Sequence, residues 1–303
     1  MDKKNWLLLL LLSILWGGSY FFVAIALTGL PIFTIVFLRV FNGAALLVLF
    51  IFLTGRKLPG NGRTWLTLFI MGFFNNAIPF TMIVSGQQYV SSGFASILIA
   101  ITPFLTVITA HLLTKDEKIS SGKIVGIFLG ILGVFILIGF ESMQWGSKEL
   151  LGSIFVLTAT VSYSIASVWG KKFKSLNMDP VATAAGQLIC SSLILLPLML
   201  ISDKPWQLPL PNIEVWGAIA GIALFSTAVA YIVYFQILRN SGATNVMLVT
   251  FLIPIIAVIM GVIFLSENFK IQYLYGMIMI GLGLVAIDGR LFQKIKGDNQ
   301  VGS

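Results

Sequence analysis

A single arginine, Arg39, interrupts the largely apolar stretch TIVFLRVFNGAALLVLFIF at residues 34–52. Arg39 lies eight residues after Pro31, which is roughly 12 Å along a helix axis and therefore inside a hydrocarbon layer about 30 Å thick. A charge near the bilayer centre costs at least about 2.5–3.5 kcal/mol, so the side chain should face protein or water. Two partners fit: an anionic group of a ligand, or main-chain carbonyls that lock neighbouring helices together.

Acidic residues are absent from the middle of every apolar stretch, because all eleven Asp and Glu residues fall in loops or near helix ends. Proton-driven carriers usually use intramembrane acids, and the one histidine, His111, lies near the end of its stretch. Facilitated diffusion or exchange is therefore favoured over tight proton coupling. The chain also lacks H-E-x-x-H, Ser/His/Asp, P-loop and zinc-ligand patterns, so we expect no enzyme, no cofactor and no metal site.

Polar and aromatic side chains are numerous within the apolar stretches, and polar groups that face lipid are unfavourable. Many should simply bond neighbouring helices, and aromatic residues near the ends can form an interfacial belt. As a set, they are expected to line a polar pocket that binds a substrate. The candidates are Trp16, Tyr20, Arg39, Asn42, Asn76, Gln88, Thr102, Tyr163, Gln187, Tyr231, Tyr234 and Asn245.

Two prolines and two glutamates recur in corresponding stretches. Pro103 and Pro254 each remove a helix hydrogen bond and act either as hinges or as static kinks. Glu117 and Glu267 close the same stretches and serve as a gate, as a bond to a neighbouring helix end, or as an ordinary solvated helix end.

The composition is that of a membrane protein. Of 303 residues, 58% are hydrophobic and 10% charged, whereas soluble domains are about 25% charged. The net charge of +8 is spread over short loops and forms no basic stripe, which argues against nucleic acid. One cysteine, Cys190, cannot form an intrachain disulfide.

Ten apolar stretches reach the roughly 20 residues that a transmembrane helix needs. They cover about residues 6–27, 31–53, 64–86, 91–114, 122–140, 149–170, 180–202, 212–237, 242–265 and 271–290. The first is longer than the apolar part of a signal peptide. Lysine and arginine gather in alternate loops, so the positive-inside rule places both termini in the cytoplasm. We expect the chain in the inner (plasma) membrane.

The chain contains an internal repeat. A Ser-Gly pair, a proline, a glutamate and three glycines recur in the same order about 150 residues apart, as Ser92-Gly93, Pro103, Glu117, Gly126, Gly133 and Gly139 and then Ser241-Gly242, Pro254, Glu267, Gly276, Gly283 and Gly289. Two halves of five helices must be inverted relative to each other, as in many secondary transporters. We therefore expect repeats at 1–143 and 144–291 and a disordered cytoplasmic tail at 292–303. The glycine series Gly122, Gly126 and Gly130 should pack helices closely, within a monomer in preference to a homodimer.

Several segments resemble the EamA-type branch of the drug/metabolite transporter superfamily: ILWGGSYFFVAIA, PIFTIVFLRVFNGAALLVL and NNAIPFTMIVSGQQYVSSGFASILIAITPFLTVITAHLLTKDE. The resemblance implies ten helices around a central cavity and small metabolites as cargo, usually exported. We therefore expect an all-α, polytopic secondary transporter that exports amino acids or related compounds by alternating access. The alternatives are a membrane ligand sensor or scaffold, and an intramembrane enzyme acting on lipid-linked substrates.

Overall fold

The computed structural model describes residues 3–114, 119–139, 146–176, 178–246 and 248–288. Within these ranges every regular element is a helix, which confirms the all-α prediction. Glu117 and the tail at 292–303 lie outside the described residues.

The helices follow the predicted stretches closely. They are α1 (Lys3–Ala26), α2 (Ile32–Leu53), α3 (Gly62–Gly72), η1 (Phe73–Ala77), α4 (Ile78–Gly86), α5 (Ser92–Ile99), α6 (Thr102–Leu113), α7 (Ser121–Ile138), α8 (Lys148–Trp169), α9 (Lys171–Ser175), α10 (Pro180–Leu198), η3 (Met199–Asp203), η4 (Pro205–Gln207), α11 (Ile213–Ala223), η5 (Leu224–Val229), α12 (Ala230–Val246), α13 (Val249–Leu265) and α14 (Ile271–Asp288).

Polar caps determine where many of these helices begin. The side chains of Asn61, Ser91, Ser147, Asp179 and Asn212 each accept a hydrogen bond from a main-chain N–H in the first turn of the helix that follows. Such caps satisfy donors that would otherwise be left without partners. The membrane helices therefore start close to where the apolar stretches start.

By length and composition, seven helical segments of the described chain can cross a membrane: Lys3–Ala26, Ile32–Leu53, Gly62–Gly86, Ser92–Leu113, Lys148–Phe173, Pro180–Asp203 and Ile213–Gly242. Three shorter apolar helices accompany them: Gly122–Ile138, Val249–Leu265 and Ile271–Ile287. Large apolar side chains such as Phe52, Phe128 and Ile263 are exposed, which suits a surface in contact with lipid. The chain is a multi-pass membrane protein.

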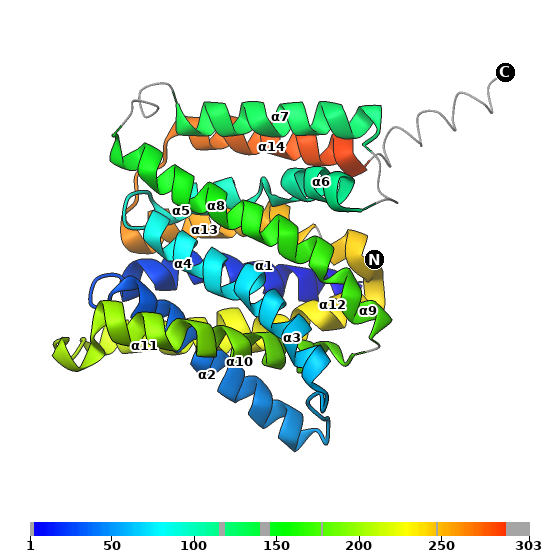
Figure 1. Ribbon diagram of the computed structural model, residues 1–303. Coiled ribbons are helices and arrows are strands. Elements are labelled where there is room, and N and C mark those ends of the chain that lie inside the picture. The colour runs from blue at the N-terminus through cyan, green and yellow to red at the C-terminus, as the bar shows by residue number, and fades with distance from the viewer. Residues whose placement is uncertain (1–2, 115–118, 140–145, 177, 247, 289–303) are drawn as a thin grey trace.

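The helices form a bundle whose long axes run roughly side by side (Figure 1). In this bundle α2 packs on α10, α4 on α8, α1 on α13, and α7 on α14. The start of α1 and the end of α14 lie at the same end of the bundle (Figure 1).

Glycines bring α7 and α14 into direct contact. A Cβ atom added to Gly126 would lie 2.6 Å from the carbonyl oxygen of Gly283, and one added to Gly133 would lie 3.0 Å from that of Gly276. Gly130 faces the ring of Phe104. The predicted glycine series therefore packs within the chain, on α14 and α6.

Within the part of the chain that the structure describes, three segments are π-helical, and the sequence did not predict them. The first, η1, lies between α3 and α4, and the second, η5, lies between α11 and α12. They begin 151 residues apart, close to the spacing of the repeated glycines. The third, η3, ends at Asp203.

The two repeated prolines differ in their surroundings. Pro103 is buried and follows the break between α5 and α6, where Ala100 and Ile101 leave the regular helix. Pro254 is also buried but lies inside the unbroken helix α13. The second half bends instead at Gly242, whose φ of 76° falls in the left-handed region that glycine tolerates.

Candidate functional site

Arg39 lies inside the helix bundle and is only 6% exposed. Its Nε–H donates to the Thr227 hydroxyl at 3.3 Å, and its guanidinium carbon lies 3.7 Å from the centre of the Phe80 ring. These contacts join α2 to η5 and α4. Together they explain why a buried arginine is tolerated here, because a hydroxyl and an aromatic face replace part of the hydration that Arg39 loses.

No carboxylate compensates the charge of Arg39 among the described residues, in which the one ion pair is Arg56–Asp179 on the surface. Neither terminal nitrogen of Arg39, Nη1 or Nη2, bonds a helix carbonyl there. The outer edge of the guanidinium therefore remains available for a bidentate bond to an anion.

Tyrosines surround the charge. Tyr20, Tyr163 and Tyr231 all lie within electrostatic range of Arg39. Tyr20 is buried, and Tyr163 and Tyr231 are half-buried. Arg39 and these three tyrosines were all predicted from the sequence as site residues, and the structure brings them together.

A hydrogen-bond network links η1 to α10 and α12. The side-chain amide of Asn75 donates to Gln187 Oε1 at 3.2 Å and to the Tyr231 hydroxyl at 3.3 Å. The amide of Asn76 donates to the same hydroxyl at 3.1 Å. Asn76 is fully buried, and its Oδ1 has no hydrogen-bond partner among the described residues.

The π-helical geometry explains how these residues reach the centre. In η1 the wider π-helical turn changes the direction in which the following side chains point. Main-chain carbonyls at this segment accept hydrogen bonds from hydroxyls of other helices. The Ser162 hydroxyl donates to the Phe74 carbonyl at 2.6 Å, and the Ser191 hydroxyl donates to the Gly72 carbonyl at 2.9 Å. In η5 the Thr227 hydroxyl bonds the Ile222 carbonyl five residues earlier at 2.9 Å. Such π-segments are frequent at functional sites, and both supply polar groups to this one.

Aromatic contacts extend the site along α1 and α12. Trp16 and Tyr234 pack with their ring centres 5.5 Å apart. Tyr231 stacks on Phe235 at 6.2 Å. The predicted residues Trp16, Tyr231 and Tyr234 therefore lie in aromatic pairs on α1 and α12.

Four predicted residues stand outside this network. Gln88 is exposed in the turn before α5, whereas its neighbour Gln87 donates to the Tyr20 carbonyl at 2.9 Å. Thr102 donates to the Ile99 carbonyl at the end of α5, and Asn245 donates to the Ser241 carbonyl of its own helix α12. Asn42 is half-buried on α2.

Phe80 was missed by the sequence analysis. An apolar residue in an apolar stretch carries no signal of its own. Its position four residues after Asn76, on the same helix face, is the one clue that the sequence offers.

Glu267 binds the start of a neighbouring helix, which was one of the predicted roles. Its Oε1 accepts from the main-chain N–H and hydroxyl of Ser92, both at 2.7 Å, and its Oε2 accepts from Gly93 N–H at 3.3 Å. Asp203 binds the start of α2 in the same way, through the Thr34 N–H and hydroxyl at 2.6 and 2.8 Å. Each carboxylate therefore joins a late segment of the chain to an early one.

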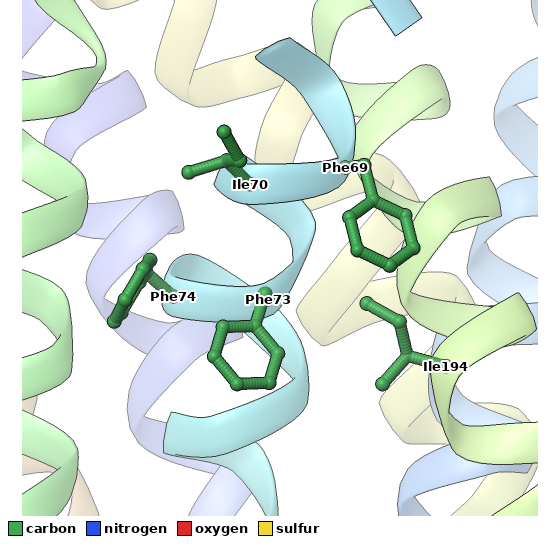
Figure 2. A pocket seen from close by; sticks show the side chains of 5 residues that line it. All are labelled: Phe69, Ile70, Phe73, Phe74 and Ile194. Atoms are coloured by element: carbon green, nitrogen blue, oxygen red, sulfur yellow. The ribbon is translucent and has the colours of Figure 1, made fainter. Parts of the chain in front are cut away.

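A surface pocket of about 200 Å³ lies beside η1. Figure 2 shows its lining by Phe69, Ile70, Phe73, Phe74 and Ile194. All five are apolar, so this pocket offers no group that could orient a polar ligand.

The model of the EamA-like transporter family matches residues 4–139 and again residues 150–287. The chain belongs to this family. It is 25% identical over 273 residues to the uncharacterized transporter YoaV of Bacillus subtilis (strain 168), covering 90% of this chain and 92% of that one. It is 27% identical over 285 residues to the uncharacterized inner membrane transporter YedA of Escherichia coli (strain K12), covering 93% and 90%.

A solved crystal structure has the same fold. It superposes with a TM-score of 0.68 at 15% identity and covers 95% of this chain and 97% of its own. The family assignment and these relatives make the protein a transporter.

Proposed function

We propose that the protein is a secondary transporter that exports a small polar or amphipathic metabolite with an anionic group, such as an amino acid or a related compound. The observation that carries this proposal is the buried Arg39, whose charge meets no carboxylate among the described residues and whose outer edge is free. An uncompensated buried charge is costly, so a bound anion is its natural partner.

The surroundings of Arg39 suit a carboxylate. The end of the guanidinium can donate two parallel hydrogen bonds to two oxygen atoms, while its Nε is already used by Thr227. Phe80 covers one face of the guanidinium and prevents water from screening it there. Trp16, Tyr163 and Tyr234 offer apolar area for the remainder of an amphipathic cargo.

The mechanism proposed is alternating access between two inverted halves of five membrane helices. The two matches of the family model, at 4–139 and 150–287, support two repeats, and the three shorter apolar helices added to the seven long ones support ten crossings. The matched π-segments η1 and η5 support a site between the halves, as expected for inverted repeats.

Closure on one side is assigned to the carboxylates of Glu267 and Asp203. Each holds the N-terminus of a helix in the first half from a segment of the second half. Charge-assisted bonds of this kind favour closure because the positive end of the helix dipole adds to them. Release of both would let the halves separate, with bending at Pro103 beside the helix break and, to a smaller extent, at Pro254 within α13.

The protein is placed in the inner membrane, as the name of YedA suggests, with both termini in the cytoplasm. Its partners are the lipid bilayer and the small-molecule cargo, and it acts as a monomer. The positive loops of the sequence support this orientation.

Transport by purified protein in liposomes tests the proposal. Efflux of radiolabelled amino acids and related carboxylates should be fast with the wild type and reduced at least about tenfold by Arg39→Gln, since a charge-assisted bond is lost. Arg56→Gln, at the surface ion pair, is the matched control and should transport normally. Folded wild-type protein that moves no member of the panel would overturn the proposal.

A further inference from the structure

Tyr231 is a hydrogen-bond donor whose proton is unused in the network that holds it. Its hydroxyl oxygen accepts from two amides, those of Asn75 at 3.3 Å and Asn76 at 3.1 Å. A tyrosine hydroxyl carries one proton and accepts through its lone pairs. Both amides approach the oxygen as donors, so the tyrosine proton must point toward another acceptor.

Gln187 fixes which atom of Asn75 faces Tyr231. The Oε1 of Gln187 accepts from the Asn75 amide nitrogen at 3.2 Å, and Gln187 is itself only 2% exposed. The nitrogen of Asn75 therefore stays between two acceptors, Gln187 and Tyr231. This arrangement orients the Tyr231 proton before any ligand arrives.

Asn76 offers the opposite chemistry. Its nitrogen is used by Tyr231, but its Oδ1 is buried and has no hydrogen-bond partner among the described residues. Leaving a buried acceptor without a donor is unfavourable. The side chain therefore calls for a donor from a ligand.

Phe80 and Tyr231 connect these two groups to the charge of Arg39. Asn76 and Phe80 are four residues apart and share a helix face, and Phe80 carries the Arg39 guanidinium. Tyr231 is within electrostatic range of Arg39. A donor on Tyr231 and an acceptor on Asn76 therefore lie in the same part of the bundle as Arg39.

We propose that Tyr231 and Asn76 form a subsite that selects carboxylates bearing a hydrogen-bond donor on the adjacent carbon, as an α-ammonium or α-hydroxyl group does. Tyr231 donates to a carboxylate oxygen, and Asn76 Oδ1 accepts from the α-donor. This rests on the proposed function, in which Arg39 binds the carboxylate. The preference for an α-donor is a property of Asn76 in η1 and Tyr231 in α12, and it is separate from the binding of the carboxylate by Arg39.

Four probes that share one side chain separate binding of the carboxylate from selection of the group on the adjacent carbon. Phenylalanine carries an α-ammonium donor and phenyllactate an α-hydroxyl donor, whereas phenylpyruvate carries an α-keto acceptor and 3-phenylpropionate carries neither. The same four groups on a methyl side chain are alanine, lactate, pyruvate and propionate, in case the site is small. Affinity of the purified full-length protein is measured by isothermal titration calorimetry in detergent micelles. Phenylalanine and phenyllactate should bind about tenfold tighter than the other two probes, with the same order in the smaller series.

Variants assign the preference to residues. Asn76→Leu should remove about tenfold in affinity for phenylalanine and much less for 3-phenylpropionate, because the α-donor loses its partner while Asn75 still donates to the Tyr231 hydroxyl. Tyr231→Phe, which keeps the stack on Phe235, should weaken all four probes. Ser192→Ala is the matched control, since its buried hydroxyl bonds only its own helix.

The outcomes are distinct. Equal affinity for all four carboxylates in both series overturns the subsite and leaves the role of Arg39 intact. Tighter binding of phenylpyruvate than of phenylalanine shows that Asn76 presents its nitrogen and also overturns it. No binding of any carboxylate by folded protein overturns the proposed function and the subsite together. If Asn76→Leu does not fold, the order of the probes on the wild type still decides.

Discussion

The guanidinium of Arg39 lies 3.7 Å from the centre of the Phe80 ring, although the two residues belong to different helices, α2 and α4. A cation over an aromatic face is stabilised by about 2 kcal/mol or more where water is excluded. The contact compensates part of the burial of the charge without using its hydrogen-bond donors. Phe80 therefore holds Arg39 in place and leaves its outer edge free for a ligand.

Replacing Phe80 tests this division of roles. Phe80→Leu should lower the free energy of unfolding by about 2–3 kcal/mol, from the lost cation–π contact and the smaller side chain. It should also weaken binding of carboxylates, because the guanidinium loses its fixed position. Phe80→Trp should restore most of the binding, and thermal unfolding with titration calorimetry measures both effects. A Leu variant that binds as tightly as the wild type would contradict the role.

Neutralising Glu267 tests the bond between the halves. Glu267→Gln keeps an acceptor for Ser92 but loses its charge at a helix N-terminus, which should cost about 1–2 kcal/mol of stability. If the contact closes one side of the transporter, the rate of substrate exchange across the liposome membrane should change together with the free energy of unfolding. Glu214→Gln, in the first turn of α11, is the control for loss of an exposed charge. Unchanged flux together with lower stability would make the contact purely structural.

Much of the fold was predictable because lipid imposes a simple pattern. Each long apolar stretch became a helix, and caps such as Ser91 and Asn212 set the helix starts. The π-segments were not predictable, because a shift of one residue in the hydrogen-bond ladder leaves no mark on composition. Their effect is large: η1 is what brings Asn75 and Asn76 to Tyr231.

The site was predictable in its residue types more than in its contacts. Arg39 stood out as a charge in an apolar stretch, and its burial confirms that it faces inward. Its partner Thr227 lies 188 residues away in sequence, a pairing that only tertiary packing determines. A turn begins at the end of α4, so Gln87 reaches the Tyr20 carbonyl while Gln88 is exposed, a difference that the sequence did not indicate.

Two glycines make a matched test of the α7–α14 contact. Gly126→Ala would place a Cβ 2.6 Å from the Gly283 carbonyl oxygen, whereas Gly217→Ala, on α11, meets nothing within 4 Å. The first should lower the free energy of unfolding by about 1–3 kcal/mol through overpacking, and the second should raise it by up to about 1 kcal/mol through helix propensity. Thermal unfolding of both variants in detergent measures the difference. Equal stability would show that α7 and α14 are not in close contact.

The two prolines provide the last prediction, since one follows a helix break and the other does not. Pro103 is the second residue of α6, which begins after the irregular turn at Ala100 and Ile101, and Pro254 lies within continuous helix α13. Pro103→Ala restores an N–H that can extend the ladder across the break, which should stiffen this segment and slow exchange several-fold at nearly unchanged substrate affinity. Pro254→Ala should alter the rate less, because its helix is already regular.

Stopped-flow flux in liposomes and equilibrium binding separate these effects. A slower rate with unchanged affinity identifies a moving part, because binding at a fixed site does not depend on the speed of the helix. Ser96→Ala, on α5 with a hydroxyl that bonds the Gly93 carbonyl at 2.6 Å, is the control for a change close to the break. Full transport rates in both proline variants would show that the kinks are static and that the halves move about other residues.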